Sequence, residues 1–339
     1  MAAIVEGAGS VDVVIAAWNR ADTIERAVLS ALRQSEVRTV FVIDDCSTDD
    51  TAARAMEAGS SSDRVVVRIL PENRGPSAAR NQALAMSSAP WVAILDGDDF
   101  FLPGRIETLL AFADEADFIA DNILLIDESQ IGEANGRSRL LDLVEPRRLN
   151  FGDFVRGNTN LGGARRRELG FLKPLIRRSF LDRHALTYDE NLRLGEDYAL
   201  YAQALAIGAR FVVSPNCGYA AALRADSLSG AHSRKDLERL RDVDRTLAAL
   251  PGLSRADRRA LASHYIGVDA RVRWLSVIDG YKLRSPAQFL SPFFAPPMAA
   301  AFLFRQLLAE GARRLPIASE SRSRPRLGAG RRPFRAPTE

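Results

Sequence analysis

The chain has 339 residues, of which 47% are hydrophobic and 26% are charged, and its formal net charge is only +3. This composition excludes a disordered or fibrous protein, and the length predicts one large domain with an appended region. Two cysteines, Cys46 and Cys217, are too few for a disulfide framework and suit a reducing compartment. Residues 1–9 contain neither a basic segment nor a long apolar one, so no signal peptide is predicted and the cytoplasm is the expected location.

Four apolar segments of strand length alternate with helix-like segments in the first third of the chain. The strands are predicted at 11–17, 39–43, 65–70 and 91–95, and the helices between them at about 22–34, from 49 or 50 onward, and at about 77–86. Asp22 is the expected N-cap of the first helix, with Glu25 completing a capping box. This alternation predicts an α/β fold with a parallel sheet and a ligand cleft at the carboxyl ends of its strands.

The fourth strand runs directly into three carboxylates, those of Asp96, Asp98 and Asp99. Burying such charges in the core is costly, so the strand must deliver them to its carboxyl end, where open α/β sheets bind ligands. A divalent cation that holds a diphosphate would supply the counter-charge, because Mg2+ and Mn2+ prefer oxygen ligands and typically bind one or two carboxylates plus phosphates. The alternative is a solvated acidic loop.

The second strand also ends in carboxylates, those of Asp44 and Asp45. The sequence contains neither the glycine-rich dinucleotide fingerprint nor a P-loop, so side chains and metal would have to hold a nucleotide. Asp44 and Asp45 could accept hydrogen bonds from a ribose or a base N–H. Alternatively, either residue could cap the helix that follows.

Four segments, at 14–19, 43–51, 73–81 and 95–99, resemble the successive blocks of family 2 glycosyltransferases in order and spacing. This resemblance covers roughly residues 10–110. It implies a GT-A nucleotide-diphospho-sugar transferase fold with a central, mostly parallel sheet, a donor sugar usually linked to UDP, and Mn2+ or Mg2+ as cofactor. The chain is most similar to the rhizobial glucosyltransferases of succinoglycan (exopolysaccharide) synthesis, which implies glucose as the donor sugar and a lipid-linked oligosaccharide as the acceptor.

The resemblance also assigns roles to individual positions. The aspartate pair contacts uracil, the loop after the first strand lies against the nucleotide, and Asp96 and Asp98 form the D-x-D motif. The donor-binding residues that it implies are Ala17, Asn19, Asp44, Asp45, Arg74, Arg80, Asp96 and Arg224. The metal ligands that it implies are Asp96, Asp98 and Asp99, and it leaves open which of these carboxylates touches the metal and which the ribose. Cys46 departs from the glycine that is common after the aspartate pair, which leaves the geometry of that turn open.

Glu196 and Asp197 resemble the E-D motif of the same family, in which the aspartate is the usual catalytic base. A carboxylate in this role takes the proton of the attacking sugar hydroxyl, and a single displacement of this kind inverts the anomeric centre. Two acidic residues at a helix start are also simply favourable to the helix dipole. Farther along, Arg224 could bind the diphosphate or form a surface ion pair, and His232 could approach the metal or be structural.

The last third of the chain is predicted to be helical, with helices from 234 and at about 255–278. The apolar segment 288–308 is interrupted by prolines and is not a transmembrane helix; it is expected to lie on a membrane surface or to pack against the catalytic domain. Eight arginines make the end of the chain basic, and this part could contact anionic lipid, nucleic acid or only solvent.

The predicted organisation is a catalytic domain at 10–232, a helical and possibly membrane-associating region at 233–312, and a basic disordered tail at 313–339. The catalytic domain is divided into a nucleotide-sugar half at 10–110 and an acceptor half at 111–232.

The sequence lacks the Q-x-x-R-W block of processive members of the family. The expected function is therefore non-processive, inverting hexosyl transfer from a UDP-sugar to a lipid-linked acceptor on the cytoplasmic face of the inner membrane, with no nucleic-acid partner. Two alternatives are a non-catalytic nucleotide-sugar-binding protein at the membrane surface and a nucleotidyltransferase.

Overall fold

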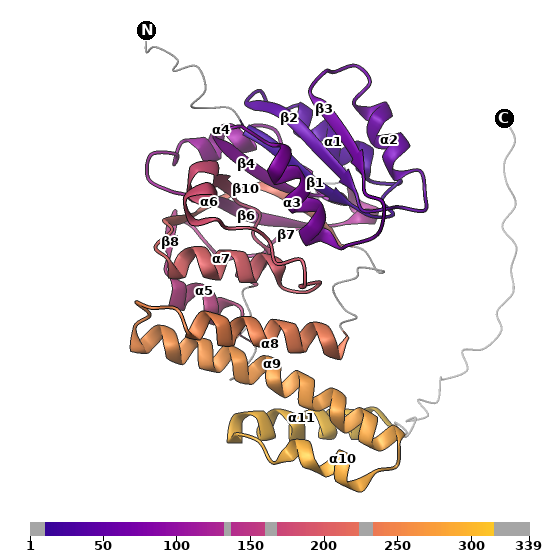
Figure 1. Cartoon of the computed structure of the whole chain (residues 1–339), viewed down its shortest axis with the longest axis vertical. Helices are drawn as coiled ribbons and strands as arrows, with labels where there is room; N and C mark the ends of the chain where they lie inside the picture. The colour runs from indigo at the N-terminus through magenta and orange to yellow at the C-terminus, as the bar shows by residue number, and fades with distance from the viewer. Residues whose placement is uncertain (1–10, 132–136, 160–167, 224–232, 315–339) are drawn as a thin grey trace, which may run out of the picture.

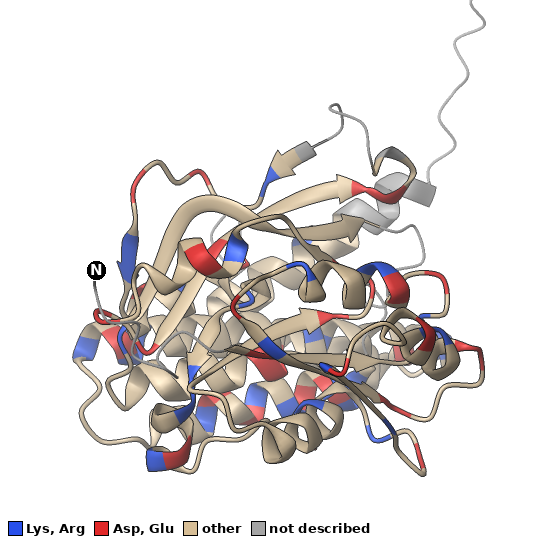
Figure 2. Cartoon of the chain, turned by 90° about the horizontal axis from the view of Figure 1, so that it is seen from above, with Lys and Arg blue, Asp and Glu red and all other residues tan. Residues whose placement is uncertain are grey.

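The structure is a computed structural model that describes residues 11–131, 137–159, 168–223 and 233–314. An α/β domain forms one end of the described chain, and a series of helices extends away from it (Figure 1). Basic and acidic residues are interspersed over this domain (Figure 2). The predicted basic tail lies, from residue 315 on, outside the described residues.

The N-terminal part alternates strands and helices as the sequence predicts. Its elements are β1 (Val11–Ala17), α1 (Ile24–Leu32), β2 (Val37–Asp44), α2 (Thr51–Ala58), β3 (Val65–Ile69), α3 (Pro76–Met86) and β4 (Trp91–Asp96). All three pairings among these strands are parallel. The predicted capping box of the first helix is wrong, because Thr23 precedes α1 and the Thr23 hydroxyl donates instead to the carbonyl of Gly97 at 2.8 Å.

The rest of the sheet and the helices beside it are built from segments without clear periodicity in the sequence. These are β5 (Phe100–Phe101), α4 (Arg105–Leu110), β6 (Phe118–Asp127), β7 (Arg137–Arg139), β8 (Arg147–Leu149), α5 (Phe151–Gly157), β9 (Leu175–Arg177), α6 (Arg178–His184), α7 (Glu196–Ala206) and β10 (Phe211–Leu223). The strand order is β3-β2-β1-β4-β9-β6-β10-β5, with β7 beside β6 and β8 beside β10. The long strands β6 and β10 are parallel to each other, whereas the short strands β5, β7, β8 and β9 pair antiparallel.

The C-terminal elements are α8 (Arg234–Ala248), α9 (Arg255–Lys282), α10 (Pro286–Leu290), a 3-10 turn (Ser291–Phe293) and α11 (Pro297–Arg314). Capping boxes at Ser233 and Ser254 begin α8 and α9. Leu237, Leu240 and Leu261 belong to the same buried core cluster as the sheet, so the hydrophobic core does not end at the predicted domain boundary. Figure 1 shows α10 and α11 at the end of the molecule farthest from the sheet.

Candidate active site

The carboxyl ends of the N-terminal strands meet at one edge of the sheet. Ala17 on β1 pairs with Asp44 on β2, and Ala16 pairs with Asp96 on β4. The two strand-end carboxylates therefore flank the end of β1, which is the usual position of a ligand site in an open parallel sheet.

Asn19 joins the loops that follow β1 and β2. Its backbone N–H donates to Oγ of Ser47 at 2.9 Å, and its side-chain carbonyl accepts from the N–H of Thr48 at 2.9 Å. Asn19 has φ of +51°, a left-handed conformation that asparagine tolerates better than most residues. This predicted donor-binding residue thus holds the two loops together at the carboxyl edge of the sheet.

Asp44 stabilises the turn after β2 and does not cap α2. Its carboxylate accepts from the N–H of Ser47 at 3.0 Å, whereas Asp49 accepts from the N–H of Thr51 at 3.0 Å at the start of α2. Between them, Cys46 has φ of +60°, in the left-handed region that glycine adopts at least cost. Cysteine thus occupies a left-handed position in this turn.

Asp45 fixes the turn that leads into α3. Its two carboxylate oxygens accept from the backbone N–H groups of Arg74 and Gly75, at 2.8 Å and 2.7 Å. Each oxygen retains a second lone pair, so this arrangement leaves Asp45 able to accept from a base. The guanidinium of Arg74 forms an ion pair with the exposed side chain of Glu190 at 2.6 Å.

At the end of β4, two buried cations meet three carboxylates. Arg80 contacts Asp96 and Glu196, each at 2.8 Å, and lies 3.5 Å from Asp197. Lys173 contacts Asp96 at 2.9 Å and Asp197 at 2.6 Å. The structure therefore brings the first aspartate of the D-x-D motif together with both residues of the E-D motif, from segments about a hundred residues apart.

The charges of this cluster are fixed by mutual pairing. Burial alone would raise the pKa of Asp96, but the charges of Lys173 and Arg80 outweigh it and hold that pKa well below its usual range. Burial would likewise lower the pKa of Lys173, yet Asp197 and Asp96 raise it well above its usual range. Asp96 is therefore ionised and Lys173 protonated at neutral pH.

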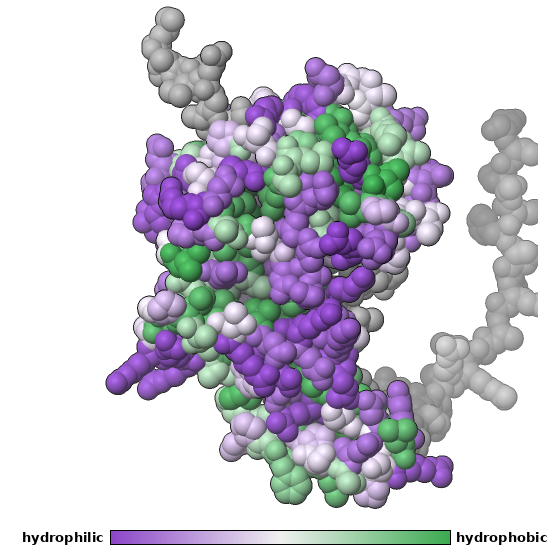
Figure 3. Space-filling view, in the orientation of Figure 1, coloured by the Kyte–Doolittle hydropathy of each residue, from purple (hydrophilic) through white to green (hydrophobic). Residues whose placement is uncertain are grey.

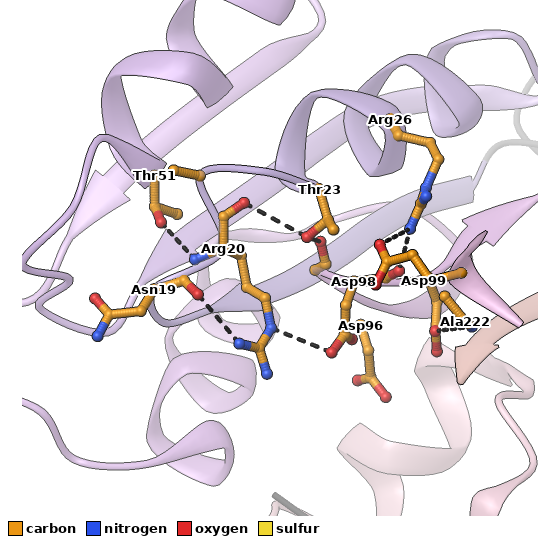
Figure 4. A network of polar contacts seen from close by, with 12 residues as sticks. Asn19, Arg20, Thr23, Arg26, Thr51, Asp96, Asp98, Asp99 and Ala222 are labelled. Atoms are coloured by element: carbon orange, nitrogen blue, oxygen red, sulfur yellow. Dashed lines mark hydrogen bonds and ion pairs between the residues drawn. The ribbon is translucent and has the colours of Figure 1, made fainter. Parts of the chain in front are cut away.

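The other two carboxylates of the predicted metal site point elsewhere (Figure 4). Asp98 lies 3.2 Å from Nε of Arg20 and its side chain is 27% exposed. Asp99 is buried, where it accepts from the Tyr219 hydroxyl at 2.7 Å and from the N–H of Ala222 at 3.0 Å. Burial, followed by the charges of Asp96 and Asp98, raises the pKa of Asp99 to about 8.

The side chains of Asp96, Asp98 and Asp99, the predicted metal ligands, thus do not converge on one point in the structure. Across the parts of the chain that the structure describes, no three His, Cys, Asp or Glu side chains are grouped so as to hold a metal ion. The reason is local: the turn after β4 sends neighbouring side chains to Lys173, to Arg20 and into the core. Asp96 and Asp98 are both partly exposed, at 28% and 27%, but Asp96 is held by two cations and Asp98 by one. Asp98 is therefore the more available ligand for Mg2+ or Mn2+ bound mainly by phosphate oxygens.

The remaining predicted residues are of two kinds. Arg224 and His232 lie outside the described residues. Lys173, in contrast, was assigned no role from the sequence although it joins Asp96 to Asp197. The only signal was weak: it is one of three lysines in a chain of 46 basic residues that otherwise uses arginine.

The C-terminal helices support the helix that carries Asp197. The Tyr198 hydroxyl donates to Asp244 of α8 at 2.9 Å, and the other oxygen of Asp244 lies 2.8 Å from Nδ1 of His264 on α9. The rings of Tyr198 and His264 stack with centroids 4.4 Å apart. The sequence showed no partner for His264, because its partners lie on two other helices.

Comparisons with known proteins indicate the family of this chain. A family model described as glycosyl transferase family 2 matches residues 12–173. Succinoglycan biosynthesis protein ExoU of Rhizobium meliloti (strain 1021) is 48% identical over 81% of this chain and 83% of that protein. Succinoglycan biosynthesis protein ExoO of the same strain is 32% identical over 86% of this chain and 82% of that protein.

A solved structure supports the fold independently. The crystal structure of S. aureus TarS 1–349 in complex with UDP-GlcNAc aligns with a TM-score of 0.61 over 90% of this chain and 87% of that chain, at 21% identity. At this identity the match concerns the GT-A fold, and it includes the C-terminal part of the chain because the aligned share is so large.

Proposed function

This chain belongs to glycosyl transferase family 2 and is a glycosyltransferase, and from that premise we propose that it transfers glucose from a UDP-sugar to a lipid-linked oligosaccharide. The proposed reaction inverts the anomeric centre and adds one sugar per encounter. The pathway we propose is the biosynthesis of a succinoglycan-type exopolysaccharide, by extension from the two succinoglycan biosynthesis relatives. The proposed location is the cytoplasmic face of the inner membrane.

The observation that carries this proposal is the position of Asp197 beside the end of β4. Its Oδ2 is held by Lys173 at 2.6 Å, whereas Oδ1 has only longer contacts, at 3.4 Å to the Tyr201 hydroxyl and 3.5 Å to Arg80. We therefore assign Oδ1 as the atom that accepts the proton of the acceptor hydroxyl. Lys173 keeps the carboxylate oriented while the hydroxyl attacks the anomeric carbon.

The donor end of the site needs positive charge. The central cluster has one more carboxylate than cations, so a diphosphate cannot be held there by Arg80 and Lys173 alone. A divalent cation bound to Asp98 would neutralise the charge that develops on the departing diphosphate. Asn19, Asp44 and Asp45 lie in the loops at the carboxyl ends of β1 and β2 and are assigned to the nucleoside.

The direct experiment incubates the purified protein with a panel of UDP-hexoses, Mn2+ or Mg2+, and lipid-linked saccharides extracted from bacterial membranes. The expected result is release of UDP with a new glycosidic bond of inverted configuration. Release of pyrophosphate would identify a nucleotidyltransferase instead, and donor binding without turnover on any acceptor would favour a binding protein.

A further inference from the structure

The end of the molecule farthest from the sheet exposes large apolar side chains that the catalytic site does not use. Seven of the fourteen exposed large hydrophobic residues in the described chain fall between residues 281 and 308. Figure 3 shows hydrophobic residues at this end, where α10 and α11 lie. Apolar exposure of this density in a folded chain usually marks an interaction surface.

Helix α11 has two apolar faces. Ala299 and Leu303 are buried, and α11 packs on α9 through that side. Met298, Phe304 and Leu308 are exposed, at 47%, 57% and 75%. Phe304 and Leu308 are four residues apart and so lie on the same side of the helix. A helix that packs through one face and presents a second apolar face to water has an unpartnered surface.

The loop and short helix before α11 carry further exposed apolar side chains. Phe294 is 86% exposed, and Leu283 and Leu290 are 68% and 55% exposed. The Phe293 ring lies 5.0 Å from that of Phe304, so this segment is packed against α11. We call the set of exposed side chains the C-terminal surface; it consists of Leu283, Leu290, Phe294, Met298, Phe304 and Leu308.

The charged residues within this segment have one sign, and Asp279, just before it, is paired with Arg234 at 2.5 Å. From residue 280 to residue 308 the sequence contains Lys282, Arg284 and Arg305 and no aspartate or glutamate. All three cations are exposed. Self-association through this surface would bring like charges together, whereas apolar side chains flanked by cations match the acyl and headgroup layers of an anionic bilayer.

We propose that the C-terminal surface docks onto a lipid bilayer that contains anionic lipid, with Phe294, Phe304 and Leu308 entering the interfacial layer. The three cations lie against the headgroups. This inference deepens the proposed function, because it names the surface that brings the enzyme to a lipid-linked acceptor. Helix α9 connects it to the active site, since the same helix carries His264 near Tyr198 and ends at Lys282.

The test is co-sedimentation of the full chain with vesicles of phosphatidylcholine alone or with about one third phosphatidylglycerol, at low and high salt. One variant carries Phe294→Ser, Phe304→Ser and Leu308→Ser, and a second carries Lys282→Gln, Arg284→Gln and Arg305→Gln. The matched controls are Met56→Ser with Val144→Ser, and Arg54→Gln with Arg68→Gln and Arg183→Gln, which change exposed residues on other elements.

The wild type is expected to bind vesicles that contain phosphatidylglycerol and to dissociate at high salt. The apolar variant should bind at least about tenfold more weakly, and the charge variant about fivefold more weakly for each cation removed. Both controls should bind as the wild type does. The affinity for UDP, measured in parallel without vesicles, should be unchanged in every variant. It shows, independently of vesicle binding, that the variant is folded and that its donor site is intact.

Three results would overturn the proposal. The first is absence of vesicle binding by the wild type. The second is wild-type binding by the apolar variant, which would assign any attachment to the basic end of the chain. The third is a concentration-dependent dimer that the apolar variant abolishes, which would make the surface a self-interface. None of these results depends on whether the chain transfers a hexose.

Discussion

Nζ of Lys173 lies 2.6 Å from Oδ2 of Asp197, and both side chains are buried. The same ammonium lies 2.9 Å from Asp96. A single cation thus joins the residue proposed as catalytic base to the strand that ends in the donor site. This arrangement makes the geometry of the base depend on a residue outside the recognised sequence blocks.

Replacement of Lys173 by methionine should lower kcat by about tenfold to a hundredfold, because Asp197 would lose the contact that orients it. Lys173→Arg should restore part of the loss, since it keeps the charge with a different geometry. The control is Lys235→Met, an exposed lysine on α8. Steady-state kinetics with a fixed acceptor would measure the effect, and an unchanged kcat in Lys173→Met would contradict the assigned role.

Removal of divalent metal with EDTA should abolish transfer, and Mn2+ or Mg2+ should restore it. Asp98→Asn should raise the metal concentration needed for half-maximal activity by about tenfold or more, because one protein ligand is weakened. Asp63→Asn, at an exposed aspartate before β3, should leave that concentration unchanged. Full activity in the presence of chelator would refute the proposed metal requirement.

Tyr198→Phe should lower the free energy of unfolding by about 1–3 kcal/mol, because Asp244 loses a buried hydrogen-bond donor. Tyr265→Phe removes a hydroxyl that accepts from Arg245 at an exposed position and should have a smaller effect. Urea denaturation of both variants would compare the losses. Equal stability of Tyr198→Phe and wild type would show that the contact between α7 and α8 contributes little.

Stability should decrease in acid in part through Asp12, at the start of the sheet. Burial alone would raise the pKa of Asp12, but hydrogen bonds from Arg38, Ala89 and neighbouring groups lower it below its usual value. The ionised form is thus favoured in the folded state, so the stabilisation is present at neutral pH and is lost as the pH falls below about 4.

Asp12→Asn should accordingly be less stable than wild type at pH 7, and the difference should narrow as the pH is lowered through that range. Denaturation curves of both proteins at several pH values would measure this difference in the free energy of unfolding. A difference that stays constant with pH would mean that the folded state does not favour ionised Asp12.

The N-terminal half of the fold could be predicted from the sequence because its strands are continuous apolar segments separated by recognisable turns. Strand β9 could not, since its three residues carry no periodic signal and it lies between β4 and β6 through long-range pairing. The cluster around Asp197 also depends on contacts distant in sequence, and the sequence therefore predicted no role for Lys173.

The predicted metal ligands illustrate the opposite case, in which neighbours in the sequence have different partners in the structure. Asp96, Asp98 and Asp99 are neighbours in sequence, and adjacency suggested a shared site. The turn after β4 instead directs them to different partners, and Asp99 accepts hydrogen bonds from β10 in the core. The helices α8 and α9 were predicted from their periodicity, whereas α10 and α11 were not. The packing of α8 against α7 and of α9 against α5 and α8 required the structure.

The central claim is that Asp197 is the catalytic base, and the most direct measurement compares kcat with the dissociation constant of the donor in Asp197→Asn and Glu196→Gln. Asp197→Asn should lower kcat by about 10²-fold or more while donor affinity changes little, because asparagine keeps the size of the side chain but cannot accept the proton. Glu196→Gln should have the smaller effect on kcat, since the Glu196 carboxylate contacts Arg80 rather than Lys173. A wild-type kcat in Asp197→Asn, or a greater loss in Glu196→Gln than in Asp197→Asn, would contradict the assignment.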